Sequence, residues 1–127
     1  MGYYSRMTGR IDINPPLPWA LFKDSPALRG RAGGLGTDVA LVVETETFDT
    51  EDGVLTKRRA VAVEAAVGDS TKNYFVVEHL QAVIDLAPGR TFTGYLECVG
   101  EDGDVWRVKV VNGEAREIKP IMTWPDE

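Results

Sequence analysis

The chain has 127 residues, which is the size of one ordinary domain, and we expect residues 1–127 to form a single α+β unit. Hydrophobic residues make up 43% and charged residues 27% of the sequence, a composition that argues against wholesale disorder and against membrane-spanning segments. The formal net charge of -6 disfavours general affinity for nucleic acids and anionic membranes, because a field of that sign repels phosphate groups.

The first predicted element is a half-buried strand over residues 6–13, where polar and apolar side chains alternate. The prolines at positions 15, 16 and 18 argue against a continuing central strand, and they favour one short helical turn over 19–23. The glycine-rich stretch at about 29–37 is typical of a flexible loop.

A hairpin is predicted next, with strands over 38–48 and 54–66 joined by an acidic turn at 49–53. Counting outward from this turn places Phe48 near Val54 and Glu44 near Arg58. Charged side chains are therefore expected to pair across the two strands.

The second half of the chain begins with an amphipathic helix, whose apolar positions over 76–87 recur at spacings of three and four. Asp69, Ser70 and Thr71 are candidate capping residues for it. Strands are expected over 91–99, 104–111 and 114–124, and the Asn112-Gly113 dipeptide predicts a tight turn between the last two.

This order of elements predicts an antiparallel-rich sheet of about six strands with one main helix packed on one face. The first six elements also match a ferredoxin-like core, which a C-terminal hairpin would extend. Because the first helix is short for that core, both descriptions stay open.

Residues suited to catalysis are scarce, since His79 and Cys98 are the only histidine and the only cysteine. We interpret His79 as a structural residue at the edge of the buried helix stripe, with a general base assisted by Glu78 or Asp85 as the alternative. Cys98 alternates with apolar residues and is interpreted as a small core side chain. We therefore predict a protein that is not an enzyme and has neither a metal site nor a cofactor.

Aromatic residues near the two ends of the chain suggest a surface that binds another protein, because such side chains are enriched at interfaces. The candidate residues are Tyr3, Tyr4, Trp19, Phe22 and Trp124. If the C-terminal strand is a sheet edge, pairing with a second copy would give a homodimer.

The alternative function is binding of single-stranded nucleic acid through the only run of cations, Lys57, Arg58 and Arg59. We expect the neighbouring Glu44 and Glu64 to neutralise much of this run, which disfavours the alternative.

Several short segments together resemble a family of small uncharacterised proteins of actinobacteria and their bacteriophages. They are Met1-Gly2-Tyr3-Tyr4, Pro15-Pro16-Leu17 with Trp19, the turn Glu51-Asp52-Gly53-Val54, Val77-Glu78-His79, Pro88-Gly89-Arg90-Thr91-Phe92 and Asp104-Val105-Trp106-Arg107. The resemblance implies a cytoplasmic accessory protein, encoded by a bacterium or by a phage. If a phage encodes it, we expect it in the host cytoplasm, and the predicted binding partner is then a host protein. The resemblance implies no catalytic motif. A single cysteine and the lack of an apolar run after the N-terminus fit that location.

Overall fold

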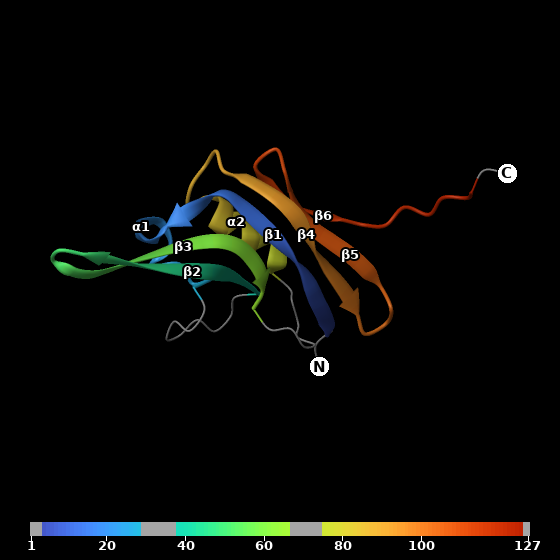
Figure 1. Ribbon diagram of the computed structural model, residues 1–127. Coiled ribbons are helices and arrows are strands. Elements are labelled where there is room, and N and C mark those ends of the chain that lie inside the picture. Colours follow the sequence, from blue (N-terminus) through green and yellow to red (C-terminus); the bar gives the residue numbers. More distant parts are fainter. Residues whose placement is uncertain (1–3, 29–37, 67–74, 126–127) are drawn as a thin grey trace.

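The computed structural model describes residues 4–28, 38–66 and 75–125. They form a six-stranded antiparallel sheet in the order β2-β3-β1-β4-β5-β6, together with two short helices (Figure 1). The strands are β1 (Ser5–Pro18), β2 (Val39–Thr50), β3 (Gly53–Ala65), β4 (Thr91–Gly100), β5 (Val105–Val111) and β6 (Glu114–Ile118), and the helices are α1 (Trp19–Phe22) and α2 (Val76–Ile84). The expectation of an α+β protein with an antiparallel-rich sheet is confirmed.

The core lies between the helices and one face of the sheet. In β1 the alternation seen in the sequence places Met7, Ile11 and Ile13 in the core. Helix α2 adds side chains at its three-and-four spacing, including Leu80 and Val83, which are almost fully buried. The interpretation of these two amphipathic segments is confirmed.

The prolines do not end β1, which runs to Pro18 although the sequence indicated a break after residue 13. Pairing with β4 stops at Asn14, and the register with β3 shifts between Asp12 and Leu17. The prolines at 15 and 16 lie in this irregular stretch, where a strand tolerates residues that cannot donate a backbone hydrogen bond.

The β2–β3 hairpin is tighter than expected. Thr50 pairs with Gly53, so two residues form the connection instead of five, and the register moves by one residue. Phe48 therefore lies opposite Leu55, and Glu44 lies opposite Arg59. The outer part of this hairpin, residues 44–58, projects beyond the rest of the sheet (Figure 1), and we call it the arm.

The last strand is shorter than the predicted 114–124, because β6 ends at Ile118. Pro120 follows, and a proline lacks the N–H that a continuing ladder requires. The turn before β6 agrees with the prediction, since Asn112 and Gly113 have φ angles of 52° and 80°.

The structure has a helix at each of the two places where the sequence predicts one, the short turn over 19–23 and the amphipathic helix over 76–87. Helix α2 has nine residues and α1 has four. The ferredoxin-like core stays a prediction, because a single helical turn occupies the place of its first helix. The proposed caps at 69–71 and the glycine-rich stretch at 29–37 lie outside the described residues. None of the helices in the described ranges is long and apolar enough to cross a membrane.

Candidate functional site

Two adjacent surface hollows lie where the arm leaves the sheet, with volumes of about 540 Å³ and 310 Å³. Pro18, Lys57 and Arg58 line both of them. Trp19, Ala20 and Thr56 complete the larger hollow, and Pro16, Glu46 and Arg59 complete the smaller one. We call the two hollows together the arm-base groove. It combines an apolar wall from the end of β1 and α1 with a cationic wall from β3.

Trp19 is held in the groove by contacts on two sides. Its ring meets that of Phe22 edge-on at 5.3 Å, and the Arg58 guanidinium lies 5.3 Å from its centroid. Phe22 is fully buried, whereas Trp19 is 39% exposed. Phe22 is therefore a core residue that supports Trp19, and it does not face solvent as the partner-binding interpretation requires. The exposed part of Trp19 remains available for contact.

The groove also exposes one edge of the β3 backbone. Strand β1 pairs with β3 only as far as Pro18, which lies opposite Arg59. Beyond that point β3 continues along the arm and pairs with β2 on its other side. Within the described ranges, residues 54–58 make no backbone hydrogen bond to any segment other than β2. An unpaired edge of this kind can accept a further extended strand.

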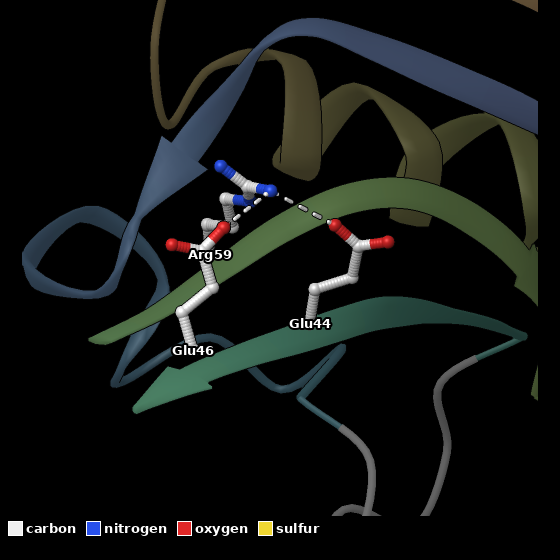
Figure 2. Close-up of polar contacts among 3 residues, drawn as sticks. All are labelled: Glu44, Glu46 and Arg59. Atoms are coloured by element: carbon white, nitrogen blue, oxygen red, sulfur yellow. Dashed lines mark hydrogen bonds and ion pairs between the residues drawn. The ribbon is translucent and has the colours of Figure 1, made fainter. Parts of the chain in front are cut away.

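Of the three candidate cations, Arg59 is already engaged by carboxylates. Its guanidinium lies 3.3 Å from a carboxylate oxygen of Glu44 and 2.9 Å from one of Glu46 (Figure 2). Glu44 is one of the two carboxylates that the sequence indicated, and Glu46 is a partner that it did not indicate. In the part of the chain that the structure describes, Lys57 and Arg58 form no ion pair. The Lys57 ammonium lies over the ring of Phe48, and the Arg58 guanidinium lies over the ring of Trp19.

The structure thus brings together residues that the sequence assigned to two different functions. Trp19, a candidate for protein binding, shares a groove with Lys57 and Arg58 of the nucleic-acid alternative. Tyr4 lies at the opposite end of β1, and Trp124 lies beyond β6. Tyr3 is outside the described residues. The aromatic candidates therefore do not form one continuous patch.

The sequence interpretation missed the prolines and Thr56 as lining residues. The prolines had been interpreted only as breaks in a strand, and Thr56 carries no distinctive pattern. These residues come together because the pairing of β1 with β3 ends at Pro18, opposite Arg59. Where that pairing ends depends on strand register, which cannot be predicted from the local sequence.

His79 joins α2 to the start of β2. Its Nδ1 accepts a hydrogen bond of 2.9 Å from the backbone N–H of Asp38, and Asp38 Oδ2 accepts one of 2.7 Å from the N–H of Phe75. These two hydrogen bonds connect the N-terminal end of α2 to Asp38, the residue before β2. The structural interpretation of His79 agrees with this geometry, while the absence of catalysis stays a prediction.

Replacing Asp38 by alanine should lower the free energy of unfolding by about 1 kcal/mol, because the backbone N–H of Phe75, the residue before α2, loses its acceptor. The effect is measured by urea unfolding followed by circular dichroism. The matched control is Asp49→Ala in the exposed arm, for which we expect a change below about 0.5 kcal/mol. Equal losses in the two variants would contradict a stabilising role for the hydrogen bond between Asp38 and Phe75.

Cys98 is fully buried in the core, as expected from its alternation with apolar residues. The pKa of its thiol is raised to about 11. Burial is the main cause, because it disfavours the charged thiolate, and nearby carboxylates raise the pKa further. The thiol is therefore protonated at neutral pH and is a poor nucleophile.

Comparison with known proteins gives one result. A family model described as "Family of unknown function (DUF6205)" matches residues 1–127. No curated protein and no solved structure matches the chain. Because the match covers the whole sequence, the chain belongs to this family of unknown function.

Proposed function

We propose that the protein acts by binding another polypeptide, and that the arm-base groove receives an extended segment carrying apolar side chains and carboxylates. The observation that carries this proposal is that an exposed aromatic ring, Trp19, lies beside Arg58 along an open strand edge, and that Arg58 forms no ion pair with any residue in the described ranges. Backbone hydrogen bonds along such an edge supply affinity, while flanking pockets select side chains.

Charge favours an acidic peptide as the ligand. Lys57 and Arg58 have no carboxylate partner within the described ranges and can pair with those of a ligand. Pro18 and Trp19 provide the apolar wall against which the other side chains of the ligand pack.

Single-stranded nucleic acid fits the groove less well, although aromatic stacking and cations are features of such sites. Glu44 and Glu46 bind Arg59, and the tip of the arm carries Asp49, Glu51 and Asp52. A polyphosphate chain extending along the arm would meet these carboxylates. The net charge of -6 adds to the repulsion.

The proposal is tested by titrating the ¹⁵N-labelled protein with a short peptide of alternating valine and aspartate. We expect amide shifts concentrated at Thr56, Lys57 and Arg58 and at the indole of Trp19. Arg58→Ala should weaken binding by about tenfold, because a charge-assisted contact is lost. Lys109→Ala, which removes an exposed cation from β5, should leave the affinity unchanged.

Two further ligands complete the experiment. A peptide of alternating valine and lysine should not bind, because it would place like charges beside Lys57 and Arg58. A thymidine oligonucleotide that binds more tightly than the acidic peptide at the same salt concentration would overturn the proposal in favour of nucleic acid. If no ligand causes amide shifts in the groove, both peptide binding and nucleic-acid binding at this site are refuted.

A further inference from the structure

The segment after β6 exposes large apolar side chains that contact nothing in the core. Ile121 and Met122 are each 86% exposed and Trp124 is 85% exposed. Residues 119–125 extend away from the sheet (Figure 1). Large apolar side chains that are exposed close to one another often mark a contact surface.

This segment has the chemistry that the arm-base groove is proposed to accept. Between Pro120 and Pro125 lie four residues that keep their backbone N–H groups, as strand addition requires. Asp126 and Glu127 follow Pro125 in the sequence and carry carboxylates. The groove offers the complementary features, which are the cations of Lys57 and Arg58 beside the ring of Trp19, neither of them in an ion pair with a described residue.

A single copy cannot make this contact within itself. The groove lies on the β2–β3 side of the sheet, and the segment leaves from β6 at the opposite edge. The β3 edge is four strand spacings from β6, and at about 4.8 Å for each spacing this distance is about 19 Å. If residues 121–124 lie along β3, only Lys119 and Pro120 remain to bridge this distance, and two residues span at most about 7 Å. The segment also leaves the sheet on the side away from α1 (Figure 1).

We propose that the segment after β6 of one copy adds as a strand to the β3 edge in the arm-base groove of a second copy. Two copies that exchange their segments in this way form a closed, symmetric dimer. The proposal rests on the function proposed above, and it names a second copy of this chain as the partner. It differs from the homodimer expected from the sequence, which pairs the C-terminal strands directly.

The test uses two variants of the full chain that disable opposite halves of the contact. In the groove variant, Lys57→Glu and Arg58→Glu reverse the cationic wall. In the segment variant, Ile121→Ala and Trp124→Ala remove the apolar side chains. All four positions are exposed and make no core contact, so circular dichroism should show that both variants are folded. Association is measured by sedimentation velocity over a range of concentrations.

We expect a dimer for the unaltered chain and at least about tenfold weaker association for each variant alone. An equal mixture of the two variants should regain dimers, because the segment of the groove variant and the groove of the segment variant still form one intact contact. Direct pairing of β6 strands predicts a different result, in which both variants remain dimeric on their own.

The outcomes separate this proposal from the one on which it rests. A monomeric chain whose amides at Thr56–Arg58 still respond to the valine–aspartate peptide would overturn the exchange and keep the groove as a peptide site. Dimers that persist in both variants, or a mixture that regains none, would also overturn the exchange. A monomeric chain whose amides show no shifts with the peptide would refute both proposals.

Discussion

Gly94→Ala should unfold a large fraction of the molecules or lower the free energy of unfolding by about 3 kcal/mol or more. Gly94 lies in β4 with a φ of +112°, and a Cβ added there would lie 2.4 Å from the backbone carbonyl oxygen of Arg10. Because that atom belongs to the central strand β1, relief of the clash requires the strands to move apart. Gly9 makes the reciprocal approach to Tyr95 and should behave in the same way.

The matched control is Gly103→Ala in the β4–β5 turn. Gly103 also has a positive φ of +86°, but an added Cβ would meet nothing within 4 Å. We expect this variant to lose about 1 kcal/mol, which is the cost of the backbone conformation without the clash. Urea unfolding of the two variants under identical conditions provides the comparison. If Gly94→Ala costs no more than Gly103→Ala, β1 and β4 do not approach as closely as described.

Phe22→Ala should lower the free energy of unfolding by about 3 to 5 kcal/mol, the usual range for a fully buried phenylalanine. Helix α1 has four residues, too few to be stable without its packing against the core. The substitution removes the side chain that anchors this turn, and with it the support beneath Trp19. Peptide binding in the arm-base groove should therefore weaken even under conditions where the variant remains folded.

Leu21→Ala serves as the control for this prediction, because Leu21 belongs to the same helical turn and is 38% exposed. We expect a loss of about 1 kcal/mol or less and unchanged peptide binding. Thermal unfolding and the amide titration measure the two effects. A loss as large as that of Phe22→Ala would mean that general helix packing, and not the Phe22 anchor, holds α1 in place.

Local sequence patterns predicted the type of most elements in this protein. Alternation identified β1 and the later strands, since a half-buried strand repeats every two residues. The Asn112-Gly113 turn was predicted correctly because only a few residue types accept positive φ at both turn positions. The boundaries were less accurate. The prolines of β1 act as strand breakers only where a ladder demands their N–H groups, and the register shift removes that demand.

The candidate site could be predicted only in part from the sequence. Trp19, Lys57 and Arg58 were selected on chemical grounds, but they were assigned to two separate functions. Phe22 was misjudged because a four-residue turn is too short to show which of its side chains is buried. The ion pairs of Arg59 depended on a hairpin register that the sequence placed one residue away.

What the sequence by itself determined is the chemistry and the local periodicity. It limited the protein to one histidine and one cysteine, excluded a strongly basic surface, and specified an antiparallel sheet with helical cover. Only the tertiary structure decided where the pairing of β1 with β3 ends, and hence that an aromatic ring, two cations and an open strand edge meet in one groove. Residues 19 and 58 are far apart in the chain, and strand register, which depends on contacts across the whole sheet, brings them within 5.3 Å.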